Sequence, residues 1–304
     1  MFGLFNPLAE HLRRLHFKTQ LPDIPSHLTT KHHSTDFPSP HPSIKMAPST
    51  AILPDPEIRY LDTASAYDLW SEVYDTDNNF LQALDSIEMQ SLLPKLISTL
   101  EHTNSLPKPW KVVDLGCGTG RNTVHIASLP LSDTSEIYAL DLSPKMLDIA
   151  RKRLEHLRQD NKERLLKFQV YDALNPSAGE TPPTNADAVI STLVVEHVPL
   201  KEYFTAAAGM LKPGGLLLLT NMHSDMGHIS QAGFVDPKTG EKIRPVSFAH
   251  TLEEVVREAG RCGFEVAVGF EERVVTEENY ELFGPRAGKW IGVKVWYGGV
   301  LRRV

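Results

Sequence analysis

The sequence predicts an α/β fold with a doubly wound and mostly parallel sheet of seven strands. From about residue 58 onward, short apolar runs alternate with segments of helical periodicity. Such alternation is typical of parallel strands joined by helices that cover both faces of a sheet. The strand candidates are residues 111–115, 136–140, 166–171, 186–192, 215–221, 264–270 and 290–296.

Several of the intervening helices have recognisable ends. Ser143 followed by Pro144 is typical of an N-cap with proline at the first helical position. Pro199 opens a later helix, and Thr251 with Glu254 forms a capping box for another. Because ligands of such sheets bind at the carboxyl ends of the strands, near the switch in strand order, functional residues are expected directly after each strand.

Composition narrows the class of protein. The chain has 304 residues, 41% of them hydrophobic, which fits one large domain with an appendage. A net charge of −7 disfavours nucleic acid as a partner. Two cysteines are too few for a disulfide framework and fit a reducing compartment. The longest aliphatic run, residues 216–219, is far shorter than the roughly 20 residues of a membrane span. We therefore expect a cytoplasmic protein without a membrane span.

Residues 1–55 differ from the remainder, because they hold six of the 13 histidines and many of the prolines. We interpret them as a disordered tail, with an amphipathic mitochondrial presequence and an over-extended start before Met46 as alternatives. A flexible proline-rich tail does not hold metal ligands in fixed geometry, so no metal site is expected there. Residues 56–304 are predicted to form the functional domain.

A glycine-rich turn follows the first strand, at Gly116, Gly118 and Gly120. Glycines let the backbone turn sharply and approach a ligand, while the next helix presents free N–H groups. A dinucleotide fingerprint would need glycine where Arg121 stands, and no phosphate-binding Gly-Lys-Ser/Thr is present. Asp114 precedes the turn and places a carboxylate where a cationic ligand is favoured, such as an ammonium or a sulfonium.

This pattern resembles the class I S-adenosylmethionine-dependent methyltransferases, whose Asp-x-Gly-x-Gly-x-Gly motif is matched by Asp114, Gly116, Gly118 and Gly120. The resemblance covers roughly residues 60–300, including the turn 211–215 before the fifth strand. It implies a Rossmann-like sheet, with residues 56–105 as a helical lid and 106–304 as a donor-binding core.

The resemblance also implies roles for acids at two further strand ends. Asp141 would accept both ribose hydroxyls, since a carboxylate has two acceptor oxygens. Asp172 and Ala173 would contact the adenine edge. Each acid also has a purely structural alternative, as a helix cap or a strand terminator. The donor-binding residues implied are Tyr67, Trp70, Tyr74, Asp114, Gly116, Gly118, Gly120, Asp141, Leu142, Met146, Asp172, Ala173 and Thr192.

Two segments are candidates for the acceptor pocket. Residues 67–75 resemble the aromatic N-terminal lid of small-molecule methyltransferases, including ubiquinone-biosynthesis types, although the same spacing would also suit simple packing. The long connection 222–250 contains a turn signal at 236–240, and connections of this length are usually functional. Residues 191–194 lack the Asn/Asp-Pro-Pro-aromatic signature of the amide and base N-methyltransferases, which argues against DNA adenine and glutamine as substrates.

His197 and His223 follow the fourth and fifth strands, so both are expected near the transferred methyl group. Either is a candidate general base, because imidazole titrates near neutrality. The alternative for His197 is a backbone hydrogen bond at a helix entry. A hydroxyl acceptor gains most from a base, so O-methylation is preferred, with N- and C-methylation open. No metal is required.

The prediction is an S-adenosylmethionine-dependent methyltransferase that acts on a small-molecule acceptor. A protein methyltransferase and a non-catalytic, donor-binding regulator stay open as alternatives. The oligomeric state does not follow from these patterns.

Overall fold

The computed structural model describes residues 58–102, 109–129, 131, 135–155, 166–177 and 180–304. The predicted tail, residues 1–55, lies outside the described residues, as do its alternatives.

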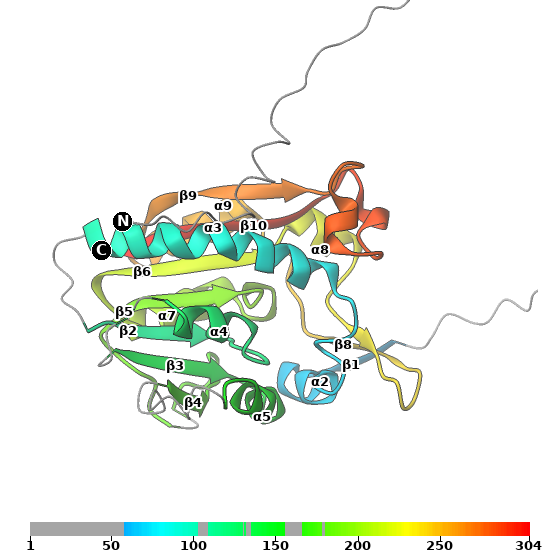
Figure 1. Ribbon diagram of the computed structural model, residues 1–304, viewed down its shortest axis with the longest axis horizontal. Coiled ribbons are helices and arrows are strands. Elements are labelled where there is room, and N and C mark those ends of the chain that lie inside the picture. Colours follow the sequence, from blue (N-terminus) through cyan, green and yellow to red (C-terminus); the bar gives the residue numbers. More distant parts are fainter. Residues whose placement is uncertain (1–57, 103–108, 130, 132–134, 156–165, 178–179) are drawn as a thin grey trace, which may run out of the picture. The chain divides into compact units, whose positions relative to one another are not determined.

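A seven-stranded sheet in the order β4-β3-β2-β5-β6-β10-β9 forms the centre of the domain (Figure 1). The first five strands of this order are parallel, and β10 runs antiparallel between β6 and β9. This confirms the predicted doubly wound, mostly parallel sheet. The strands are β2 (Lys111–Leu115), β3 (Glu136–Asp141), β4 (Leu166–Val170), β5 (Ala186–Thr192), β6 (Leu211–Met222), β9 (Phe264–Val274) and β10 (Lys294–Arg303).

The last strand lies further along the chain than the sequence predicts. Residues 290–296 were expected, but Trp290 ends the short 3-10 helix η5 (Gly288–Trp290), and Gly292 turns the chain at φ +85°. The strand instead continues through Gly298 and Gly299, residues that normally weaken strands. A Cβ at Gly298 would lie 2.5 Å from the Trp296 ring, so the ring takes the space that a side chain would need.

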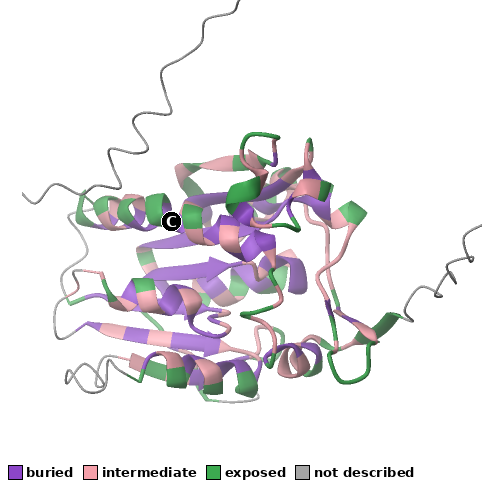
Figure 2. Cartoon of the chain, turned by 45° about the vertical axis from the view of Figure 1, so that its right-hand side comes forward, coloured by how far each residue is buried: buried purple, intermediate pink, exposed green. Residues whose placement is uncertain are grey.

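Helices cover both faces of the sheet and bury its apolar side chains. Because side chains alternate along a strand, Val112 contacts one apolar layer and Val113 the other. The first layer is completed by α3 (Phe80–His102) and α4 (Arg121–Ala127), with α5 (Pro144–Arg153) packed beside them, and the second by α7 (Leu200–Met210) and α9 (Leu252–Arg261). Figure 2 shows buried strands enclosed by helices whose outer turns are exposed.

A second, three-stranded sheet joins segments that lie far apart in the chain. Strand β1 (Ile58–Leu61) pairs in parallel with β8 (Lys242–Pro245), which pairs antiparallel with β7 (Phe234–Val235). Together with α2 (Thr63–Trp70), these three strands form a unit that we call the cap. The cap lies beyond the arrowheads of β3 and β5 in Figure 1.

The cap therefore combines part of the predicted lid with the predicted insertion 222–250. Its small core contains Ala66 and Trp70 from α2, Phe234 and Ile243 from the insertion, and Met146 from α5. The lid is not purely helical, because β1 belongs to it, and the remainder of the range 56–105 is mainly α3, which packs on the large sheet.

Candidate functional site

A cavity of about 380 Å³ opens at the carboxyl ends of β2, β3, β4 and β5, and we call it the first cavity. Its other wall consists of residues in or next to the cap: Asp62, Thr63, Val246 and Phe248. The sequence analysis named none of them individually, although Val246 and Phe248 belong to the predicted segment 222–250. Ten of the predicted site residues line it: Tyr67, Tyr74, Gly116, Gly118, Asp141, Leu142, Asp172, Ala173, Thr192 and His197. The predicted residues that do not line it are Trp70, Asp114, Gly120, Met146 and His223.

The glycine-rich turn brings backbone to the cavity wall where no side chain fits. A Cβ at Gly116 would lie 2.2 Å from Cγ2 of Val194, and the residue has φ +76°. Gly118, at φ +54°, donates its N–H to Oδ2 of Asp141 over 2.8 Å. Gly120 begins α4 in the left-handed conformation. The Val194 side chain therefore excludes any residue but glycine at Gly116. At all three positions the left-handed backbone conformation also favours glycine.

Asp141 has the structural role that the sequence left open, and it also lines the first cavity. Oδ2 accepts from Gly118, and Oδ1 accepts the N–H of Ser143 at 2.8 Å, directly before α5. A carboxylate oxygen has two lone pairs, so each oxygen keeps one acceptor site toward the cavity. Burial raises the pKa of Asp141 to about 6.

Asp172 also has a structural task. Its two oxygens accept from the N–H of Leu174 and from Nδ2 of Asn175, both at 2.8 Å, and so close the turn after β4. Asp172 and Ala173 nevertheless line the first cavity together.

The structure does not bring Asp114 to the cavity. Its side chain is 1% exposed and accepts from Oγ1 of Thr123 at 2.5 Å, below the glycine-rich turn. Burial raises the pKa of Asp114 to about 7. Met146 and Trp70 are likewise placed in the core of the cap, although Trp70 also faces a neighbouring cavity.

That neighbouring cavity, of about 350 Å³, is the second cavity. It shares Tyr67, Tyr74 and Leu193 with the first. Leu193 has φ +58°, a conformation that branched residues rarely adopt and that clusters at functional sites. Its N–H donates to the carbonyl of Thr220 at 2.9 Å, so the sheet holds this residue between the two cavities.

His197 is buried and engaged through both ring nitrogens. Nδ1 lies 2.8 Å from the carbonyl oxygen of Val246, which can only accept, so Nδ1 carries the proton. Nε2 therefore accepts from the Tyr67 hydroxyl at 2.8 Å. Burial lowers the pKa of His197 to about 4 and raises that of Tyr67, so the imidazole is neutral and the phenol keeps its proton.

His223 lies in neither cavity. It caps α8 (Ser224–Ile229), where Nδ1 accepts the N–H of Asp225 at 3.0 Å. Nε2 consequently carries the proton and donates to Glu272 on β9 at 2.7 Å. The expectation that His223 points to the reacting methyl group is not met, because the helix cap turns the ring toward β9.

The sequence analysis passed over Glu196, which lines the second cavity. Its side chain is 5% exposed, and Oε2 has no hydrogen-bond partner among the described residues. Oε1 lies 3.9 Å from Nε2 of His197. Burial raises the pKa of Glu196 to about 7. The position of Glu196 directly after the fourth strand could have marked it as a candidate, but the sequence analysis chose the neighbouring His197.

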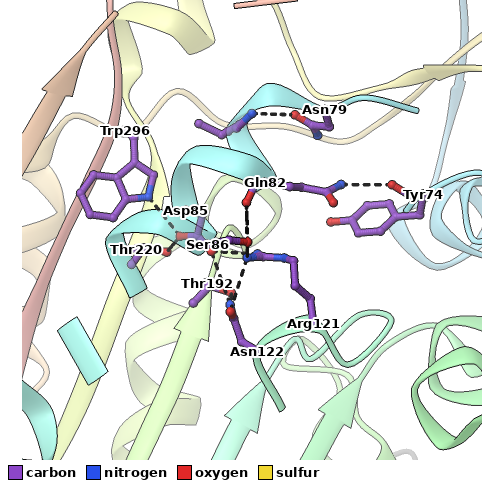
Figure 3. Close-up of polar contacts among 11 residues, drawn as sticks. Tyr74, Asn79, Gln82, Asp85, Ser86, Arg121, Asn122, Thr192, Thr220 and Trp296 are labelled. Carbon is purple, nitrogen blue, oxygen red and sulfur yellow. Dashed lines mark hydrogen bonds and ion pairs between the residues drawn. The ribbon is translucent and has the colours of Figure 1, made fainter. Parts of the chain in front are cut away.

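The buried carboxylate of Asp85 forms a hydrogen-bond network with residues of several elements near the cavities (Figure 3). Asp85 of α3 is fully buried and accepts from Arg121 at 2.8 Å, Thr220 at 2.6 Å and Trp296 at 3.1 Å. The adjacent Asn122 donates to Oγ1 of Thr192 at 2.8 Å. The network thus ties α3 to the start of α4 and to the strands that carry the cavity wall.

Within the described part of the chain, no cluster of three or more His, Cys, Asp or Glu side chains is arranged to hold a metal ion. No helix there is long and apolar enough to cross a membrane.

Comparison with known proteins agrees with this geometry. A family model described as "Methyltransferase domain" matches residues 113–219. The uncharacterized methyltransferase AN0656 of Emericella nidulans is 46% identical over 260 residues, which cover 79% of this chain and 91% of that protein. The chain belongs to the class I S-adenosylmethionine-dependent methyltransferases.

More distant relatives of this methyltransferase include two enzymes named for O-methylation. The ubiquinone biosynthesis O-methyltransferase of Cereibacter sphaeroides is 27% identical over 47% of the chain, and an O-methyltransferase of Pyrenophora dematioidea is 28% identical over 53%. The chain spans 55% and 58% of their respective lengths. S-adenosylmethionine is the methyl donor of the enzyme. The residues present fit this donor, since Gly116 and Gly118 bring backbone to the wall of the first cavity and Asp141, in the same wall, keeps free lone pairs.

Proposed function

We propose that the methyltransferase transfers a methyl group from S-adenosylmethionine in the first cavity to an oxygen of a small molecule in the second cavity. Asp141 would bind the ribose, Asp172 and Ala173 the adenine, and the glycine-rich turn the amino-acid part of the donor. The observation that carries the proposal is that the two cavities meet at Tyr67, Tyr74 and Leu193.

Methyl transfer is an in-line displacement, so its main requirement is alignment of the acceptor oxygen with the S–CH₃ bond. The oxygen forms the new bond to carbon, the sulfur keeps the electron pair of the broken bond, and the acceptor proton leaves to a base. Adjoining cavities with a shared wall favour this alignment. The rings of Tyr67 and Tyr74 suit the sulfonium, because the faces of aromatic rings attract cations.

Glu196 is the residue that we propose as the base. Its Oε2 is unpartnered among the described residues, and a pKa near 7 suits proton removal at neutral pH. His197 stays a candidate from the sequence, but its Nε2 already accepts a hydrogen bond from the Tyr67 hydroxyl, and this geometry favours a positioning role. An ionisable base favours a hydroxyl as the acceptor, and the names of the two relatives also support O-methylation.

A small molecule is favoured over a protein substrate by the volume of the second cavity, about 350 Å³, which lies in the range of small-molecule sites. The test is incubation of the full chain with methyl-labelled S-adenosylmethionine and a cell extract separated into metabolites and proteins. We expect label in the metabolite fraction and S-adenosylhomocysteine as the second product. Label in protein would favour the protein methyltransferase, and donor binding without either product would favour the regulator.

The Glu196→Gln variant then tests the base. We expect kcat to fall by about 10²–10⁴ with little change in donor affinity, because general-base catalysis contributes on that order. The exposed Glu202→Gln on α7 is the matched control. Wild-type kcat should rise with pH through about 7, the pKa of Glu196, because the base must be ionised. An unchanged rate in Glu196→Gln would reject this role.

A further inference from the structure

Three basic side chains from separate elements converge on the second cavity. Lys242 comes from β8, Lys289 from η5, and Arg286 from the turn before η5. No carboxylate of the described residues lies within 4 Å of any of the three, whereas many other Lys and Arg side chains form ion pairs. Arg286 donates only to the backbone carbonyl of Asp77, at 2.8 Å, within the described chain.

These cations repel one another. Burial and the charges of Arg286 and Lys242 lower the pKa of Lys289, whose Nζ lies 5.0 Å from the Trp290 ring. Like charges held close together are unfavourable, and a bound anion would relieve this repulsion. The chain as a whole has net charge −7, so the accumulation is local.

The acids of the second cavity offset the cations only in part. Asp77 accepts from Nε1 of Trp70 at 2.8 Å and from the N–H of Asn79 at 3.0 Å. Burial raises the pKa of Asp77 and the charge of Arg286 opposes this rise, so the carboxylate offsets part of the charge of Arg286. Glu196 lines the cavity but forms no ion pair with a Lys or Arg of the described residues. Three cations and two acids line the cavity, so an excess of positive charge faces it.

Much of the remaining wall is aromatic or apolar, beside the polar Asn79, Ser230 and Gln231. Trp70 stacks on Phe234 with ring centroids 5.2 Å apart, and Phe80 stacks on Trp290 at 5.9 Å. Met222 and other apolar side chains complete this wall. The second cavity thus combines aromatic and cationic side chains, and Lys289 lies directly over the Trp290 ring.

We infer that the acceptor is a small organic anion, with an apolar body against the aromatic wall and a carboxylate or phosphate group held by Lys242, Arg286 and Lys289. Arginine favours both groups because its planar fork donates two parallel hydrogen bonds. This inference rests on the proposed function, since it takes the second cavity as the acceptor site.

The test uses the full chain saturated with S-adenosylhomocysteine and follows tryptophan fluorescence, because Trp70 and Trp290 line the second cavity. The probes are hydroxyphenylalkanoic acids, their primary amides, and hydroxyphenylalkyl phosphates. We expect acids or phosphates to bind at least about tenfold tighter than the amides, the order of one charge-assisted contact. A triple variant with Lys242, Arg286 and Lys289 changed to Gln should lose this preference while it keeps its affinity for the amides.

The matched control changes three exposed lysines, Lys145, Lys152 and Lys201, to Gln. These lysines do not line the cavity, and their substitution removes the same total charge as the triple variant. The control should keep the preference for anions. Equal affinity for acids, phosphates and amides, or an equal loss in the control, would overturn the inference. If the anions instead compete with S-adenosylhomocysteine, the placement of donor and acceptor in separate cavities fails, which is a failure of the proposed function.

Discussion

The hydroxyl of Tyr67 donates to Nε2 of His197 across 2.8 Å, while Nδ1 of the same imidazole donates to Val246. Tyr67 belongs to α2, and Val246 follows β8, so one buried ring joins both chain segments of the cap to the end of β5. The Tyr67 and His197 rings also meet edge to face, with centroids 5.2 Å apart.

Tyr67→Phe should lower the free energy of unfolding by about 1–3 kcal/mol, because a buried acceptor on His197 loses its donor. It should also reduce turnover, since Tyr67 separates the two cavities. Urea denaturation and steady-state kinetics measure the two effects. Tyr60→Phe, at an exposed cap tyrosine, is the control. If Tyr67→Phe is as stable as the wild type, the hydrogen bond between Tyr67 and His197 does not hold the cap.

Asp141→Ala should weaken donor binding by more than about 1.5 kcal/mol, the loss expected for a pair of charge-assisted hydrogen bonds. Titration calorimetry with S-adenosylhomocysteine measures this change. Asp148→Ala on α5 is the matched control, because its carboxylate is exposed and pairs only with Arg151 among the described residues. An affinity equal to that of the control would remove Asp141 from the donor site.

Glu196→Gln should change how stability depends on pH. Burial raises the pKa of Glu196 from 4.5 to about 7, so the native state binds more protons than the unfolded state between these values. The contribution of Glu196 to stability is therefore complete below pH 4.5 and is lost as the pH rises through 7. Glutamine does not titrate, so the variant should gain on the order of 1–3 kcal/mol relative to wild type across this window. Urea unfolding at pH 4.5, 6 and 8 tests this, and a difference that is independent of pH would contradict it.

Gly116→Ala and Gly240→Ala should separate backbone strain from steric clash. Both residues have nearly the same φ, +76° and +74°, but a Cβ meets Val194 only at Gly116. The left-handed conformation costs each alanine about 1–2 kcal/mol. Overpacking against Val194 should add about 1–3 kcal/mol at Gly116. Chemical denaturation of both variants gives the difference, and equal losses would mean that Val194 moves aside freely.

The sheet and the first cavity were largely predictable, because their signals are local. Gly116 and Gly118 have positive φ angles, which favour glycine, and Ser143 with Pro144 marks the start of the helix beside Asp141. These constraints act within a few residues and therefore appear in the sequence. The last strand was predicted too early in the chain, because the glycines Gly298 and Gly299, which are unfavourable in strands, lie inside β10.

The cap and the second cavity were not predictable in the same way. Strand β1 has four residues and β7 two, so neither has a readable period. Their pairing depends on contacts such as Ile58 with Lys242, which are far apart in the chain. The surroundings of His223 and Glu196 were not predictable for a related reason, since what each side chain faces depends on distant segments of the chain.

The edge shared by β1 and β8 has a consequence for protein engineering. A chimera that receives only residues 222–250 from a relative would set a foreign β8 against the native Ile58–Leu61. Mismatched side chains between β1 and β8 would disturb the cap, which lines both cavities. Grafting a new substrate preference onto this scaffold therefore requires that the two segments be exchanged together.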